Sequence, residues 1–146
     1  MNYFEVKVKC FRTQEDGCDK KVTEDYVADA ESFTEAEARI IKEVFDTAKS
    51  DVEIASIAKT KYSEVMYSDK TEDDKWYKCK ISNTIVDENT GKEKKANVYY
   101  LIQASSLETA RTYILKLMDG TVSDWELNSI IETPVLEVYD FITNLA

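Results

Sequence analysis

The fold of this chain is decided by a stretch that occurs twice, as Tyr3-Phe4-Glu5-Val6-Lys7-Val8 and again as Trp76-Tyr77-Lys78-Cys79-Lys80-Ile81. In both copies apolar and polar side chains alternate, which is the period of a β-strand with one buried face. The similarity continues in order through both halves of the chain, with Gly17 returning as Gly91. A unit this long is too large for a short stacking repeat. We therefore expect one supersecondary unit that has been duplicated.

Each copy is expected to begin with a hairpin that leads into a helix. Asp16-Gly17 and the run from Asp87 to Gly91 are turn signals between apolar strand patterns. Each second strand then reaches a Ser-x-x-Glu capping box, at Ser32 and at Ser105, which predicts a helix start. Gly120 is placed to end the second helix.

The rest of each copy is expected to hold a short helical segment and a closing strand. The apolar spacing in Val52–Ala58 and Trp125–Ile131 favours one or two helical turns, with Trp125 in the core. Lys61–Tyr67 and Val135–Phe141 are the predicted closing strands. Each copy is therefore a β-β-α-β repeat.

The predicted fold class is α+β, with residues 1–146 as one compact domain. Repeat 1 covers residues 3–67, an acidic linker covers 68–75, and repeat 2 covers 76–141. Because one sheet face with one helix is hard to stabilise alone, we expect the repeats to share a core through a pseudo-two-fold axis. The sheet is expected to be antiparallel with the helices on one side. The run Glu72-Asp73-Asp74 is expected to be solvated.

Composition excludes several classes of site. The chain has no histidine, which removes His-dependent triads and most zinc sites. No carboxylates have a spacing that indicates paired acid–base work. Asp87-x-Asn89-x-Gly91 resembles a calcium loop only in part, because glycine falls at the fifth position, and a hairpin turn explains it. We expect no catalytic residues, no metal and no cofactor.

The chain is expected to be cytoplasmic and not membrane-bound. Met1 leads directly into a strand pattern without the basic and apolar regions of a signal peptide, and no apolar run could span a bilayer. The cysteines, Cys10, Cys18 and Cys79, are expected to be reduced thiols, with Cys79 buried. The formal net charge of −10 favours solubility, repulsion from nucleic acid, or mimicry of it.

The outward face of the two repeated strands is the candidate binding face. If the apolar residues point inward, aromatic and lysine side chains point outward, and rings with cations on an open sheet can bind single-stranded nucleic acid. A solvated face, or a face used for contact between copies of the chain, would have the same pattern. The residues concerned are Tyr3, Lys7, Lys9, Trp76, Lys78 and Lys80.

Several segments together resemble a known family: residues 3–8, residues 32–39, residues 75–78 and the run Glu132-Thr133-Pro134. The chain is similar over nearly its whole length to small proteins of Bacteroidota, their mobile elements and their phages, catalogued as a domain of unknown function. The resemblance implies a phage or mobile-element context inside a bacterial host. It implies no activity and no site residues.

We expect a non-enzymatic accessory protein that acts through protein–protein contacts, because no cluster of chemistry-bearing residues stands out. The alternative is a single-stranded nucleic-acid-binding module that uses the candidate face. An enzyme with carboxylate chemistry is a third hypothesis. A homo-oligomer formed through a sheet edge or the open face is also consistent with the sequence.

Overall fold

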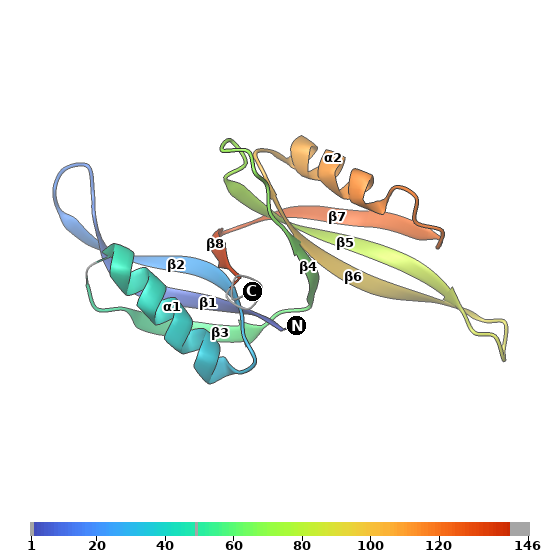
Figure 1. Ribbon diagram of the computed structural model, residues 1–146, viewed down its shortest axis with the longest axis horizontal. Helices are drawn as coiled ribbons and strands as arrows, with labels where there is room; N and C mark the ends of the chain where they lie inside the picture. The colour runs from blue at the N-terminus through green and yellow to red at the C-terminus, as the bar shows by residue number, and fades with distance from the viewer. Residues whose placement is uncertain (1, 49, 141–146) are drawn as a thin grey trace. The chain divides into compact units, whose positions relative to one another are not determined.

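The computed structural model describes residues 2–48 and 50–140, and in these residues it has two four-stranded sheets and two helices (Figure 1). The mixed α+β class is therefore confirmed. In chain order the elements are β1 (Tyr3–Thr13), β2 (Asp19–Asp29), α1 (Phe33–Ala48), β3 (Glu53–Lys59), β4 (Tyr62–Met66), β5 (Lys75–Val86), β6 (Glu93–Ala104), α2 (Leu107–Met118), β7 (Trp125–Thr133) and β8 (Val135–Tyr139).

The chain folds into two compact units whose borders fall between strands. Unit 1 comprises the described parts of Met1–Thr60 and Pro134–Ala146, and unit 2 comprises Lys61–Thr133. The segment predicted as a linker, residues 68–75, lies inside unit 2, where Lys75 is the first residue of β5. The predicted end of repeat 2 at Phe141 lies outside the described residues.

The two sheets have the same strand order. It is β3-β1-β2-β8 in unit 1 and, read from the opposite edge, β7-β5-β6-β4 in unit 2. β8 pairs with β2, and β4 pairs with β6, in both cases in parallel. The closing strand of each half therefore lies in the sheet built by the other half. The prediction of an antiparallel sheet was wrong for these pairs, so each sheet is mixed.

The predicted short helical segments are the edge strands β3 and β7. Each contains a β-bulge: Ser56 and Ile54 pair with consecutive residues of β1, and Ser129 and Leu127 pair with consecutive residues of β5. The extra residue places Ile54 and Ile57, or Leu127 and Ile130, three positions apart on one face. That spacing imitates a helix, which is why the sequence prediction was wrong here.

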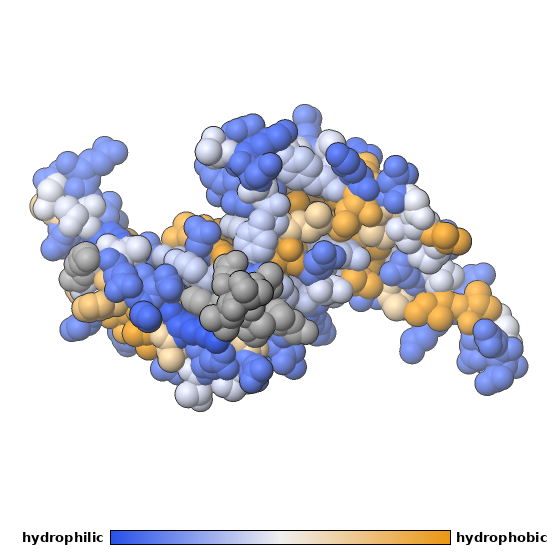
Figure 2. Space-filling view, viewed as in Figure 1, coloured by the Kyte–Doolittle hydropathy of each residue, from blue (hydrophilic) through white to orange (hydrophobic). Residues whose placement is uncertain are grey.

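Each helix packs on its own sheet in the manner expected from its apolar face. In unit 1, Ala36, Ile40 and Val44 of α1 are buried against alternate residues of β1 and β2. In unit 2, Ile114 and Met118 of α2 belong to a cluster with residues of β5 and β6. Cys79 is fully buried in that cluster, as predicted. Figure 2 shows further apolar side chains, in orange, beside α2 and near the tip of the β5–β6 hairpin.

The segment with a partial calcium-loop pattern is a hairpin turn. The amide of Asn89 donates to the Asp87 carboxylate at 2.9 Å, and the amide of Gly91 donates to the Asp87 carbonyl at 2.8 Å. Gly91 has a φ of 69°, a left-handed conformation that favours glycine. The turn joins β5 and β6, as the sequence predicted. None of the described helices is long and apolar enough to cross a membrane.

The helix starts are only partly as predicted. In α1 the amide of Glu35 donates to Oγ of Ser32 at 3.1 Å, which is one half of the expected capping box. In α2 the N-cap is Ser106, whose Oγ accepts from the amide of Thr109 at 3.2 Å, so the prediction of Ser105 was wrong by one residue. α2 ends at Met118, and Gly120 follows with a φ of 82°.

Replacing the cap serine should destabilise the protein measurably. We expect Ser106→Ala to lower the free energy of unfolding by about 1 kcal/mol, because the amide of Thr109 loses its acceptor. Urea unfolding followed by circular dichroism measures this. Glu108→Gln is the control, since the hydrogen bond that involves Glu108 uses its backbone carbonyl. A larger loss from Glu108→Gln than from Ser106→Ala would contradict the assigned cap.

Candidate functional site

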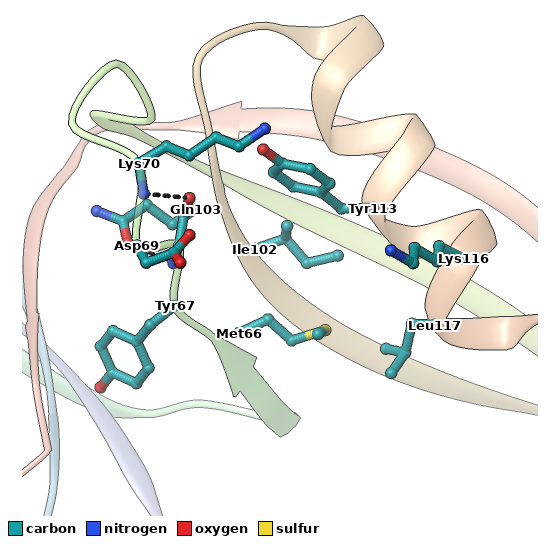
Figure 3. A pocket seen from close by; sticks show the side chains of 10 residues that line it. Met66, Tyr67, Asp69, Lys70, Ile102, Gln103, Tyr113, Lys116 and Leu117 are labelled. Carbon is teal, nitrogen blue, oxygen red and sulfur yellow. Dashed lines mark hydrogen bonds between the residues drawn. The ribbon is translucent and has the colours of Figure 1, made fainter.

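A hollow in unit 2 lies between β4, β6 and α2, and we name it the β4–α2 pocket. Its volume is about 450 Å³, which is within the range of small-molecule sites. Met66, Ile102 and Leu117 form an apolar floor, and Tyr113 stands beside it (Figure 3). The complete lining is Met66, Tyr67, Ser68, Asp69, Lys70, Ile102, Gln103, Tyr113, Lys116 and Leu117.

Two lysines stand at the rim of the β4–α2 pocket. Lys70 extends from the segment after β4 towards Tyr113, and Lys116 reaches in from α2 (Figure 3). Neither ammonium group takes part in an ion pair among the described residues. Asp69 is the one carboxylate among the lining residues, so these side chains carry a net positive charge.

A buried aspartate holds the two walls of the pocket together. Asp73 is only 2% exposed, and its Oδ2 accepts from the Ser68 hydroxyl at 2.5 Å and from the Tyr113 hydroxyl at 2.7 Å. Ser68 belongs to the segment after β4, whereas Tyr113 belongs to α2. The side chain of Gln103 on β6 accepts from the Ser68 amide at 2.9 Å. The position of the wall is thus fixed by hydrogen bonds from two elements.

The hydrogen bonds keep Asp73 ionised. Burial by itself would raise the pKa of its carboxyl, but hydrogen bonds from Ser68, Tyr113 and Ser105 favour the charged form and hold the pKa below its ordinary value. The same bond from Tyr113 raises the pKa of the Tyr113 phenol, because ionisation would place two negative charges together. Tyr113 is therefore a fixed, neutral wall of the pocket.

A second surface feature of unit 2 is an open groove between α2 and the edge strand β7, which we name the α2–β7 groove. Its volume is about 510 Å³. Arg111 and Leu115 line it from the helix, and Trp125, Leu127 and Ile130 line it from the strand. In the described part of the chain β7 pairs only with β5, so its outer edge has no strand partner.

Unit 1 contains a buried carboxyl without a hydrogen-bond donor. Asp25 on β2 is 5% exposed, and neither of its carboxyl oxygens accepts a hydrogen bond in the described structure. It lines a small hollow of about 170 Å³ with Lys7, Thr23, Glu24, Pro134 and Leu136. Lys7 is its register partner on β1 and is solvent-exposed.

Burial raises the pKa of Asp25 to about 7, and the neighbouring carboxyl of Glu5 adds to the rise. The positive charge of Lys7 opposes it. A hydrogen bond between Asp25 and Glu5 requires a proton on one of them, so the pair lacks a donor once both are ionised. The fold therefore keeps Asp25 partly protonated near neutral pH.

The structure divides the predicted binding face into two groups. Tyr3, Lys7 and Lys9 lie on β1 in the sheet of unit 1, and Trp76, Lys78 and Lys80 lie on β5 in the sheet of unit 2. Lys7, Lys9 and Lys78 are exposed, and Tyr3 and Lys80 are half-buried.

Trp76 is not exposed, although it alternates with the core-facing Tyr77 and Cys79 as the prediction required. It is 1% exposed, and its ring packs edge-on against Tyr67 with centroids 5.6 Å apart. The Nζ of Lys78 lies 4.9 Å from the ring centroid of Tyr99, so a cation of this face already contacts an aromatic ring of the same sheet.

Sequence reasoning missed the β4–α2 pocket completely. Asp73 was expected to be a solvated linker residue, and nothing in the pattern around it indicates that Tyr113, forty positions later, donates to it. Lys70 and Lys116 are likewise unremarkable on their own. The pocket depends on β4 joining the second sheet, and a pattern of alternation does not identify the partner of a strand.

Comparison with known proteins identifies a family. The family described as Domain of unknown function (DUF4494) matches residues 2–141, so the chain belongs to it. The prediction of an uncharacterised domain family is confirmed. No curated protein and no solved structure matches the chain.

Stability should fall as pH rises from about 4 to about 7, because the folded-state pKa of Asp25 lies above the ordinary value of 3.8. In that interval the folded state holds a proton that the unfolded state has released. We expect Asp25→Asn, which is neutral and can donate to Glu5, to remove this dependence. Above pH 7 the variant should be more stable by roughly 2–4 kcal/mol.

Urea unfolding at pH 4, 5.5 and 8 measures the effect. The exposed Asp46 of α1 provides the control substitution, Asp46→Asn. An advantage of Asp25→Asn that stays constant across these pH values would contradict the assignment.

Proposed function

We propose that this member of the DUF4494 family is a non-enzymatic binding protein that acts through protein–protein contacts at the α2–β7 groove. The observation that supports this is the combination of an unpaired strand edge with an adjoining partly apolar groove. An extended peptide can add to such an edge by backbone hydrogen bonds, and the groove can receive its alternate side chains.

The side chains along β7 favour this mode of binding. Trp125 and Leu127 are half-buried against the core and still line the groove, and Leu115 on the helix side is 38% exposed. A large ring on a partly desolvated surface is a common anchor of a protein interface. Ile131 is also exposed, at 58%, but it alternates with the core-facing Ile130 and therefore lies on the opposite face of the strand from the groove.

The charges at the edge indicate the chemistry of the partner. Glu132 is exposed on β7 and Asp124 directly precedes the strand, while the carboxylate of the exposed Glu126 already lies 4.0 Å from Nζ of Lys95. The partner segment that fits is therefore extended, with apolar residues on one face and basic residues among the others. Basic side chains would meet the acidic edge while apolar ones enter the groove.

The wider setting that we propose rests on the sequence. The identical strand order of the two sheets supports an origin by duplication, with the closing strands exchanged between the halves. A bacterial cytoplasm and a phage or mobile element are the proposed context. A second copy of this chain, paired through an edge strand, would be a special case of the same binding mode.

The nucleic-acid alternative has less support. Its strongest stacking residue was Trp76, and this ring is buried against Tyr67. The exposed lysines and the half-buried rings of Tyr3 and Tyr99 remain available, so the burial of Trp76 weakens the stacking part of single-strand binding and leaves its salt-sensitive part.

Selection from a random peptide display library on the immobilised full-length protein tests the proposal. We expect the enriched peptides to be extended, apolar and basic, and to lose at least about tenfold in affinity on Trp125→Ala, because the large aromatic ring of the groove is removed. Fluorescence anisotropy with a labelled peptide measures the affinity.

Phe45→Ala is the matched control, since Phe45 is an aromatic residue of α1 that is 50% exposed and lies in unit 1. Failure to enrich any peptide, or equal affinity of the Trp125→Ala variant and the parent, would refute the groove as the binding site.

A further inference from the structure

We propose that the β4–α2 pocket binds a small organic anion, with a carboxylate held between Lys70 and Lys116 and an aromatic body on the apolar floor. This site is separate from the α2–β7 groove, because the two share no lining residue.

The charge at the rim selects the anionic group. Two ammonium groups approach the hollow from opposite walls, and neither has a carboxylate within 4.0 Å in the described structure. In a chain with a net charge of −10, these are two cations at one hollow without a carboxylate partner of their own among the described residues. Asp69 and the ionised Asp73 behind Ser68 and Tyr113 offset their charge, so the selection of an anion rests on direct contact with the ammonium groups.

The floor selects the rest of the ligand. Ile102 is 1% exposed, while Met66 and Leu117 are half-buried, so the floor offers apolar surface that is not fully covered. The flexible thioether of Met66 and the face of Tyr113 are suited to contact with a planar ring. The volume of about 450 Å³ accommodates a bicyclic aromatic compound.

The pocket is preorganised for such a ligand. Asp73 fixes Ser68 and Tyr113 relative to each other, and Gln103 fixes the Ser68 backbone. The Tyr113 hydroxyl already donates to Asp73, so the phenol cannot supply its proton to an anion. Recognition of the charge therefore depends on the two lysines, and little conformational freedom of the walls is lost on binding.

A matched pair of probes tests the inference on the full-length protein. 1-Naphthaleneacetate carries the proposed anion, and 1-naphthaleneacetamide has nearly the same shape without the charge. We expect the acetate to bind about fivefold more tightly than the amide, as one partly exposed ion pair allows. Titration followed by ¹⁵N NMR should shift the amides of residues 66–70 and 116–117.

Variants of the two lysines distinguish binding at this site from non-specific binding of the probes to the protein surface. Lys70→Gln with Lys116→Gln should abolish the preference for the acetate while the NMR spectrum stays that of the folded protein. Arg111→Gln removes the same charge from the same helix but lies in the α2–β7 groove, so it should preserve the preference. Equal affinity for both probes, or shifts confined to other residues, would overturn the proposal. Because the readout does not involve peptide binding, failure here is independent of the function proposed for the groove.

Discussion

The parallel pairing of β4 with β6 and of β8 with β2 is the constraint on which the rest of the structure depends. Each half of the chain builds a three-stranded sheet around its first strand. In the first half β2 and β3 lie on either side of β1, and α1 connects them. In the second half β6 and β7 lie on either side of β5, and α2 connects them. Such a sheet would leave β2 or β6 as an open edge, and open edges promote unwanted pairing. The closing strand from the other half covers that edge.

The exchange of closing strands also creates the β4–α2 pocket. β4 enters the second sheet at its edge, and the chain then passes through residues 67–74 before it enters β5 in the same sheet. This return segment carries Lys70 and Asp73 to the side of α2. Had β4 paired within the first sheet, neither residue would face Tyr113. The site is thus a consequence of strand pairing, and the local sequence of the segment only supplies its side chains.

Features that depend on neighbouring residues could be predicted from the sequence, and features that depend on long-range strand pairing could not. The hairpins, the presence of the two helices and the buried faces of β1 and β5 are encoded by neighbouring residues, and they were predicted from the sequence, although the start of α2 was placed one residue early. The bulges of β3 and β7 place apolar residues three positions apart, as in a helix, so the sequence of these strands was compatible with both structures. The parallel partners of β4 and β8 have no local signal. Asp73 and Trp76 were misplaced because their burial depends on neighbours that are distant in sequence.

Asp73 and Asp25 are both buried aspartates, but burial has opposite effects on their charge. Asp73 receives two hydroxyl donors, so it remains charged and anchors the wall of a pocket. Asp25 faces the carboxyl of Glu5 and an exposed lysine, and it receives no donor in the described structure. A buried carboxylate without donors opposes folding, because its lost hydration is not replaced. Asp73 therefore contributes to the fold in its ionised form, whereas Asp25 is compatible with the fold mainly in its protonated form. The number of hydrogen-bond donors, and not the depth of burial, determines which form of each carboxyl the fold favours.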